Sequence, residues 1–119
     1  MRTGEGVVAE NELALAITDE FPLNPGHTLI VPRRHEGDYF RLTEEEQTAI
    51  VALIREVQVG LQKQYRPAAF NVGLNSGPAA GQTIPHTHVH LIPRYLGDVP
   101  DPRGGVRWII PERAPYWED

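Results

Sequence analysis

The sequence predicts an α+β domain in which an antiparallel sheet of about five strands is covered on one face by one long helix. Short apolar segments with a two-residue alternation come first, a single long segment with helical periodicity follows, and alternating segments return after it. Strands that are grouped on either side of a helix, instead of alternating with helices, are typical of α+β architectures. A chain of 119 residues has room for one domain, and we expect the strands to follow one another as a meander.

Three strands are expected before the helix. Residues 6–10 and 12–18 are apolar segments on either side of Asn11, a residue that tolerates left-handed turn geometry, so they predict a hairpin. Two prolines and a glycine then interrupt the chain. The segment HTLIVP, residues 27–32, predicts the third strand, which Pro32 is expected to close.

One long helix is expected within residues 41–66. Its apolar residues recur at the spacing of one helical face, namely Ile50, Leu53, Ile54, Val57 and Leu61. Thr43 and Glu46 have the spacing of a capping box, which predicts that the helix begins there. Val51 and Val59 lie off the main apolar face, and they are either exposed single valines or a second surface that meets a partner subunit.

Two more strands and a tail are expected after the helix. Residues 69–75 alternate apolar and polar side chains, and the glycine-containing loop 75–83 leads to a fifth strand at 87–93. Residues 97–119 are rich in proline and glycine, but they also contain aromatic residues, which are scarce in disordered tails. We therefore expect a single domain, 1–119, that ends in an ordered tail with little regular structure.

The composition argues against several classes of partner and site. With 11 basic and 16 acidic residues the net charge is −5, and the basic residues are scattered, which argues against binding to nucleic acid or an acidic membrane. The lack of cysteine excludes disulfides, thiolate zinc sites and a cysteine nucleophile. No apolar run approaches the roughly 20 residues of a membrane helix, and no signal-peptide pattern is present. A soluble cytoplasmic protein is the expectation.

Three of the five histidines alternate in the segment IPHTHVHLIPR, residues 84–94. On a strand, His86, His88 and His90 would point to the same side at steps of roughly 6.5–7 Å, while the residues between them would face the core. A solvated polar face is the simplest interpretation of a single histidine. Three imidazoles in register beside a glycine-containing loop favour a functional site.

A zinc site is one alternative, because two histidines two positions apart on a strand can bind the same ion. It would need a further ligand, for which His27 and His35 are the candidates. Three imidazoles spread over roughly 13–14 Å of strand cannot all reach one ion with bonds of about 2 Å. We therefore expect no obligatory metal.

Covalent catalysis at phosphorus is the other alternative, in which a neutral imidazole attacks and its neighbours donate hydrogen bonds to the oxygens. His88, the middle histidine, is the geometrically reasonable nucleophile, and histidine is largely neutral at pH 7. In the preceding loop, Asn75 and Gln82 offer side-chain amides. Ser76 and Thr83 offer hydroxyls, and the glycines make backbone N–H groups accessible to a phosphate.

The segment HTHVHLI, residues 86–92, resembles the signature of the histidine-triad (HIT) family, with Thr87 where the signature has a hydrophobic residue. The segment LALAITDEFPLNPGHTLIVPRRH, residues 13–35, is similar to the second and third strands of that family. The GQT before the histidines and the LIPR after them resemble the bacterial type of the fragile-histidine-triad branch, which hydrolyses dinucleoside polyphosphates. The resemblance implies a HIT-like fold.

The resemblance also implies roles for individual residues. His88 matches the nucleophile that forms a nucleotidyl-imidazole intermediate, and His86 and His90 match the flanking catalytic histidines. His27 matches a histidine that packs against the triad, and Asp19 occupies a ribose-binding position. The polar residues around the phosphates are matched by Asn75, Gln82 and Thr83.

The implied function is a nucleotidyl hydrolase that cleaves dinucleoside polyphosphates or related nucleotide conjugates at the α-phosphorus and releases a nucleoside monophosphate. The alternatives are a phosphorylase or nucleotidyltransferase with the same intermediate, and a non-catalytic nucleotide- or zinc-binding regulator. No obligatory cofactor is implied, although a divalent cation could enter with the substrate, and members of the family are commonly homodimers. Without the resemblance, Asp19 would be interpreted as a turn residue, and His35 is interpreted as a surface or helix-cap histidine.

Overall fold

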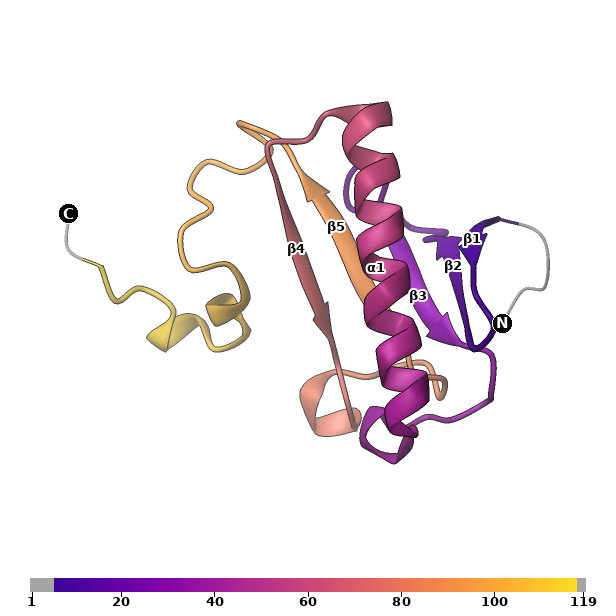
Figure 1. Ribbon diagram of the computed structural model, residues 1–119. Coiled ribbons are helices and arrows are strands. Elements are labelled where there is room, and N and C mark those ends of the chain that lie inside the picture. The colour runs from indigo at the N-terminus through magenta and orange to yellow at the C-terminus, as the bar shows by residue number, and fades with distance from the viewer. Residues whose placement is uncertain (1–5, 118–119) are drawn as a thin grey trace.

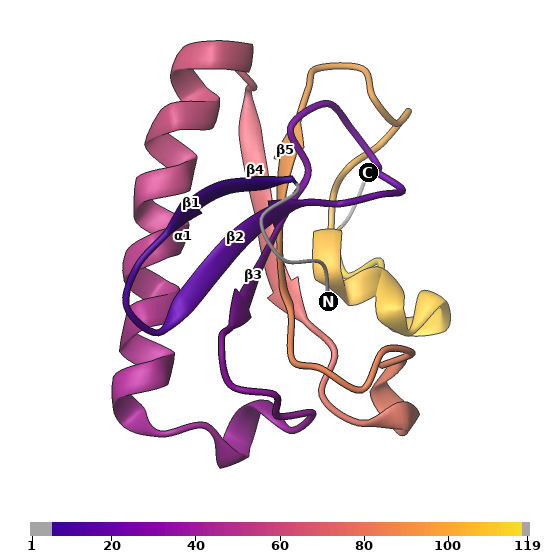
Figure 2. The same cartoon turned by 90° about the vertical axis from the view of Figure 1, so that its right-hand side faces the viewer.

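A five-stranded antiparallel sheet forms the centre of the structure, a computed structural model that describes residues 6–117 (Figure 1). The strands are β1 (Val7–Glu10), β2 (Ala14–Thr18), β3 (Thr28–Pro32), β4 (Ala69–Leu74) and β5 (Val89–Arg94). One helix, α1 (Glu44–Tyr65), lies along one face of the sheet (Figures 1 and 2). The predicted α+β class and the expected five strands are confirmed.

The order of the strands corrects the expected meander. The spatial order is β1-β2-β3-β5-β4, so β5 lies between β3 and β4. Every pairing of neighbours is antiparallel, and β3 and β4 therefore run parallel to each other. Parallel strands cannot be joined by a tight turn and need a crossover, which α1 supplies between β3 and β4. β5 then enters the gap as the antiparallel neighbour of both strands.

The hairpin of β1 and β2 turns at Asn11, but not for the expected reason. The Asn11 Oδ1 atom accepts the N–H groups of Leu13 at 3.1 Å and Ala14 at 2.9 Å, and its Nδ2 donates to the carbonyl of Ala49 in α1 at 2.9 Å. Among the described non-glycine residues, Arg66 alone has a positive φ. Asn11 therefore forms the turn by side-chain hydrogen bonds and not by a left-handed backbone.

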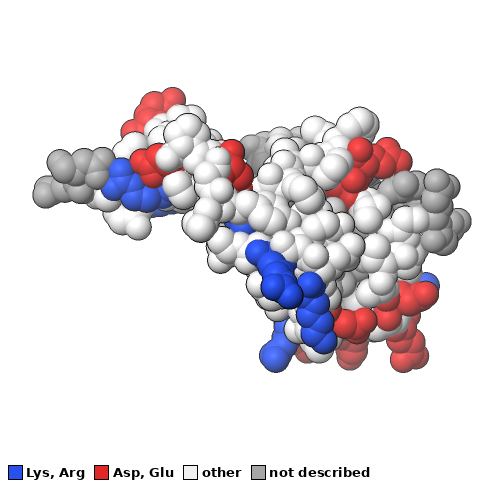
Figure 3. Space-filling model, turned by 90° about the horizontal axis from the view of Figure 1, so that it is seen from above, with Lys and Arg blue, Asp and Glu red and all other residues white. Residues whose placement is uncertain are grey.

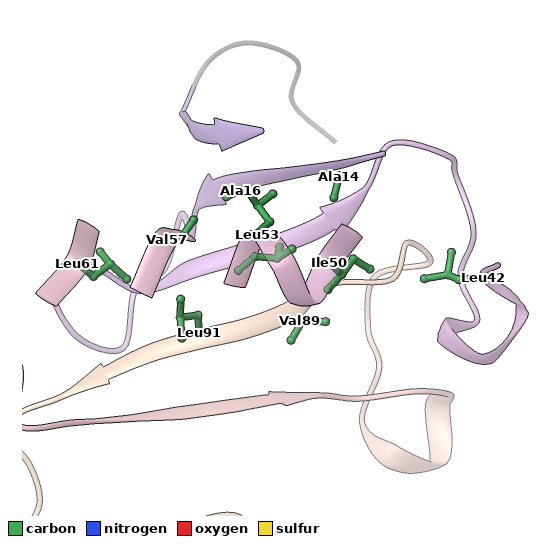
Figure 4. Packing of buried hydrophobic residues seen from close by; sticks show 10 residues of the cluster. Ala14, Ala16, Leu42, Ile50, Leu53, Val57, Leu61, Val89 and Leu91 are labelled. Atoms are coloured by element: carbon green, nitrogen blue, oxygen red, sulfur yellow. The ribbon is translucent and has the colours of Figure 1, made fainter. Parts of the chain in front are cut away.

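The core lies between the sheet and α1 (Figure 4). The helix contributes Ile50, Leu53, Val57 and Leu61, as its periodicity predicts, and the sheet contributes Ala14, Ala16, Ile30, Val89 and Leu91. A second, smaller cluster of Ile17, Leu29 and Val31 lies apart from the first. β3 is buried at every position because its side chains enter both clusters.

The predicted capping box begins α1. The Thr43 side chain accepts the N–H of Glu46 at 3.1 Å, and the Glu46 carboxylate accepts the N–H of Thr43 at 2.8 Å. The hydrogen bond from the Arg34 guanidinium, followed by the one from the Thr43 backbone, lowers the pKa of the buried Glu46 to about 2. Val51 and Val59 are half exposed, so they do not belong to the core.

The tail after β5 has little regular structure, as expected. It contains two short 3-10 turns, Gly105–Ile109 and Pro111–Arg113, and runs beyond β4 on the side of the sheet away from α1 (Figures 1 and 2). The Arg107 guanidinium donates to the carbonyls of Arg113 at 2.6 Å and Ala114 at 2.9 Å. These bonds close the tail on itself.

The distribution of charge agrees with the composition. On the face that Figure 3 shows, the described Lys and Arg residues form separate small groups with Asp and Glu elsewhere on the same face, and no continuous basic surface is seen. Within residues 6–117, α1 is too polar to cross a membrane, and no other helix is long enough.

Candidate active site

The three alternating histidines lie where the sheet ends, and this corrects the expectation that one strand carries them all. β5 begins at Val89, so His90 is in the strand, whereas His86 and His88 precede it. Pairing between β3 and β5 stops at Val89, opposite Ile30. Beyond that point the Thr87 N–H donates to the carbonyl of Glu36 at 2.8 Å, in the loop after β3. The hydrogen bonds between β3 and β5 are replaced at this point by the contact of Thr87 with the loop. The three histidines therefore do not lie along one regular strand.

His88 has a proton position that its surroundings dictate. Its Nδ1 atom lies 2.9 Å from the backbone carbonyl of His86. A carbonyl can only accept, so we assign the proton of the neutral ring to Nδ1, which leaves the lone pair on Nε2. The side chain is buried, and its ring lies 5.2 Å from the ring of His90, centroid to centroid. His88 therefore offers a nucleophilic Nε2 next to a second imidazole.

A chain of hydrogen bonds sets the opposite tautomer on His90. The backbone N–H of Leu23 donates to Nδ1 of His27 at 3.0 Å, so neutral His27 carries its proton on Nε2. His27 Nε2 lies 2.9 Å from Nδ1 of His90 and donates to it. His90 must then carry its own proton on Nε2. An acceptor nitrogen on His88 and a donor nitrogen on His90 thus belong to adjacent rings.

His86 is turned away from this pair. Its Nε2 atom donates to the carbonyl of Pro32, the last residue of β3, at 3.0 Å. Its Nδ1 atom lies 2.9 Å from Nδ1 of His35, which therefore acts as the donor. Both ring nitrogens of His86 are occupied within the protein, so its contact with the site is through its backbone carbonyl to His88.

The contact between His35 and His86 is the part of this site that sequence reasoning missed. His35 is exposed to solvent, as the surface interpretation predicted, but it also packs edge-on against His86, with ring centroids 4.8 Å apart. Its position three residues after Pro32, the end of β3, was the available signal. The sequence showed the position but not the direction of either ring.

Burial keeps three of these imidazoles neutral. It is the largest cause that lowers the pKa of His27, His86 and His90 below 6.5. Neighbouring histidines lower the pKa of His86 and His90 further, while the Asp19 carboxylate acts in the opposite direction on His27 and His90. Neutral rings are what the assigned tautomers require.

Asp19 lies at the outer end of the chain of imidazoles. Its Oδ2 atom is 3.3 Å from Nε2 of His27, and its Oδ1 atom accepts the N–H of Phe21 at 2.8 Å. Asp19, His27 and His90 place one ligand atom each within 4.8 Å of one another, which is compact enough for a metal ion. A metal on Nε2 of His27 would move the His27 proton to Nδ1, where it would face the donating N–H of Leu23. This arrangement favours hydrogen-bonded neutral imidazoles over a metal at the cluster.

The polar loop before the histidines is held to the loop after β3 by the side chain of Gln82. Gln82 donates its side-chain amide to the carbonyls of Gly37 at 2.8 Å and Ile84 at 3.0 Å, and its Oε1 accepts the N–H of Gly77 at 2.8 Å. Its amide therefore holds two loops together. Asn75 and Thr83 are exposed to solvent.

The structure thus brings some of the predicted site residues together and leaves others apart. One continuous set of contacts joins Asp19, His27, His90 and His88. The loop that carries Gln82 and Thr83 instead lines a pocket with residues that follow β3. Contact between this loop and a phosphate stays a prediction.

The chain is similar to several known proteins. A model of the HIT domain matches residues 3–97, and this match ends where the tail begins. The asymmetrical bis(5'-nucleosyl)-tetraphosphatase of Schizosaccharomyces pombe is 38% identical over 95 residues, covering 80% of this chain and 52% of that protein. The AP-4-A phosphorylase of Mycobacterium tuberculosis is 39% identical over 93 residues, covering 77% of this chain and 48% of that protein.

A solved structure supports the same relationship. The crystal structure of a HIT family protein from Bacillus anthracis matches with a TM-score of 0.73 and 39% identity, over 76% of this chain and 64% of that one. The chain spans about half to two thirds of the length of these three relatives.

Proposed function

The chain belongs to the HIT domain family, and from that premise we propose that it is a nucleotidyl hydrolase acting on dinucleoside polyphosphates or related nucleotide conjugates. The observation that carries the proposal is the set of hydrogen-bond partners from which opposite tautomers are assigned to the adjacent rings of His88 and His90. His88 presents a lone pair on Nε2, and His90 presents a proton on Nε2. A nucleophile beside a hydrogen-bond donor is the arrangement that attack on a phosphoryl group requires.

In the first step, Nε2 of His88 attacks the α-phosphorus and the bond from that phosphorus to the bridging oxygen breaks. The leaving group departs with the bridging oxygen, and the His88 ring gains a positive charge. The carbonyl of His86 accepts from Nδ1 of His88 and becomes a stronger partner as that charge develops. The His90 Nε2–H can donate to an oxygen of the reacting phosphate or of the leaving group.

In the second step, water attacks the nucleotidyl group on His88 and the P–N bond breaks. The products are a nucleoside monophosphate and neutral His88, and the water proton leaves to solvent or to the released group. Asp19 is proposed to accept hydrogen bonds from the ribose hydroxyls, since its Oδ2 is engaged only at 3.3 Å by His27. Asn75 and Thr83 are proposed to contact the phosphates because both are exposed in the adjoining loop.

Replacement of the nucleophile tests the proposal. His88→Asn is expected to lower the turnover of diadenosine tetraphosphate by roughly 10³-fold or more, while AMP still binds. Mass spectrometry of acid-sensitive adducts in a rapid quench should detect a nucleotidyl-histidine in the natural protein and none in the variant. Near-normal turnover in His88→Asn would exclude His88 as the nucleophile.

A phosphorylase with the same intermediate is a second candidate, favoured by the similarity to the M. tuberculosis AP-4-A phosphorylase. Inorganic phosphate would then replace water in the second step, so a nucleoside diphosphate would be released from the intermediate. Product analysis with and without added phosphate separates the two reactions. A regulator without catalysis is the third candidate, and it predicts nucleotide or zinc binding without any covalent adduct.

The homodimer expected for the protein stays a proposal. The half-exposed Val51 and Val59 on α1 are surfaces that a second copy could cover. Sedimentation velocity over a range of protein concentrations measures the assembly state directly, and a monomer at every concentration would refute the dimer.

A further inference from the structure

A pocket of about 640 Å³ lies beside the histidines and is formed by two loops. Residues 37–40 supply one wall, after β3, and residues 76–85 supply the other, directly before His86. This volume lies within the range of sites that hold small organic ligands. None of the catalytic imidazoles lines the pocket, so it is a separate space next to them.

The two walls are fixed to each other by Gln82. Its amide donates across the pocket to the carbonyl of Gly37, and the same side chain accepts the N–H of Gly77. Because the Gln82 amide both donates and accepts a hydrogen bond, it restricts the movement of the two loops relative to each other. The pocket is therefore formed before any ligand arrives, which reduces the entropy lost on binding.

The chemistry of the walls selects a neutral, partly aromatic occupant. Phe40 is 76% exposed and Ile84 is 44% exposed, and both line the pocket. Asp38 adds a carboxylate, and no Lys or Arg is among the lining residues. A phosphate would meet an acid without a compensating cation. A nucleoside instead offers a planar base for Phe40 and hydroxyl or amino donors for Asp38.

The position of the pocket relates it to the reaction. It lies on the His86 side of the site, whereas Asp19 contacts His27 at the opposite end. Ile84 is four positions before His88, a separation of at most about 13 Å of extended chain. The pocket also contains Thr83, one of the proposed phosphate contacts. A ligand with its first ribose at Asp19 and its reacting phosphorus at His88 would extend its remaining phosphates toward this pocket.

We infer that this pocket, defined here as the Phe40 pocket, binds the nucleoside of the leaving group. The inference rests on the proposed hydrolase function, which it extends by naming where the second half of a dinucleoside polyphosphate is held. It predicts that the protein prefers substrates with a nucleoside at both ends of the phosphate chain. Substrates with a small leaving group would not use the Phe40 pocket.

The test compares two substrates in two variants. Phe40→Ala is expected to lower kcat/KM for diadenosine tetraphosphate by roughly 5- to 100-fold, the loss that corresponds to one stacked base. The same variant should hydrolyse adenosine 5'-phosphoramidate, whose leaving group is ammonia, at the natural rate. Phe40→Trp should retain activity on both substrates because the ring is kept. Tyr116→Ala is the matched control, since Tyr116 is an aromatic residue of the tail with 72% exposure.

The outcomes separate the pocket from the reaction. If the natural protein hydrolyses both substrates, an unchanged kcat/KM for diadenosine tetraphosphate in Phe40→Ala would overturn the inference. An equal loss on both substrates would also overturn it, because the effect would then be structural. If the natural protein hydrolyses neither substrate, the proposed function itself fails and the leaving-group assignment fails with it.

Discussion

Acidification is expected to destabilise the fold through its buried histidines. Burial lowers the pKa of His27, His86 and His90 below the value of 6.5 that an unfolded chain would have. Above pH 6.5 both states are neutral and the histidines contribute no pH dependence. As the pH falls below 6.5, the unfolded state takes up protons first, so the free energy of unfolding decreases.

The size of this effect follows from the number of neutral rings. A histidine that stays neutral in the folded state can remove at most about 1.4 kcal/mol of stability per pH unit below its unfolded pKa. His27 and His86 are 3% and 5% exposed, so both should approach this limit. His90 is partly exposed and should contribute less. Because the slope reaches this limit only well below pH 6.5, the three rings together remove at most about 3 kcal/mol between pH 6.5 and 5.5, a large part of the roughly 5–15 kcal/mol of an ordinary domain.

Urea unfolding followed by far-ultraviolet circular dichroism, which reports α1 and the sheet, measures this loss at pH 7.5 and 5.5 as a shift of the midpoint. The Glu46 carboxylate does not contribute to a shift between these two pH values. The stability that Glu46 contributes is present above pH 4.5 and is lost only as the pH falls toward about 2. His86→Asn is the control, and it should reduce the slope of stability against pH whatever its effect on stability at pH 7.5. Equal midpoints at the two pH values would refute the reasoning.

Two further predictions concern the scaffold. Thr43→Ala should lower the free energy of unfolding by about 1 kcal/mol in urea titration, because an orphan N–H at the start of α1 loses its acceptor; Thr43→Ser should not. Gly26→Ala should cost about 1–3 kcal/mol in the same assay, because φ is +92° and a Cβ atom would lie 3.1 Å from Pro93 and Tyr65. Gly60→Ala, toward the C-terminal end of α1, is the matched control: a Cβ atom there meets no atom within 4 Å, and the substitution should stabilise the protein by about 1 kcal/mol.

The features predicted well from the sequence are those that local chemistry determines. The start of α1 follows from Thr43 and Glu46, three residues apart, and its buried face follows from the spacing of Ile50, Leu53 and Val57. Hydrogen bonds and periodicity within one segment decide these features, so the sequence of that segment is sufficient. The same holds for the positions of the strands, although not for their order in space.

The features that were missed depend on contacts between distant segments. The direction of the His86 ring is decided by the carbonyl of Pro32, which lies 54 residues earlier, and by His35. The sequence also did not predict that the Gln82 amide donates to the carbonyl of Gly37, which lies 45 residues earlier. Each of these side chains could bond to several partners, and only the packed fold determines which partner is within reach.

Main-chain groups set the proton positions of three imidazoles in the site, and the proton of His90 follows in turn from the side chain of His27. The N–H of Leu23 orients His27, the carbonyl of Pro32 orients His86, and the carbonyl of His86 orients His88. A substitution replaces a side chain but keeps the backbone carbonyl, and it keeps the N–H unless the new residue is proline. Side-chain substitutions in the surrounding loops therefore leave these main-chain partners in place while they change the surface that the loops present to a ligand. The orientation of the imidazoles depends on the path of the backbone, whereas the lining of the neighbouring pocket depends on replaceable side chains.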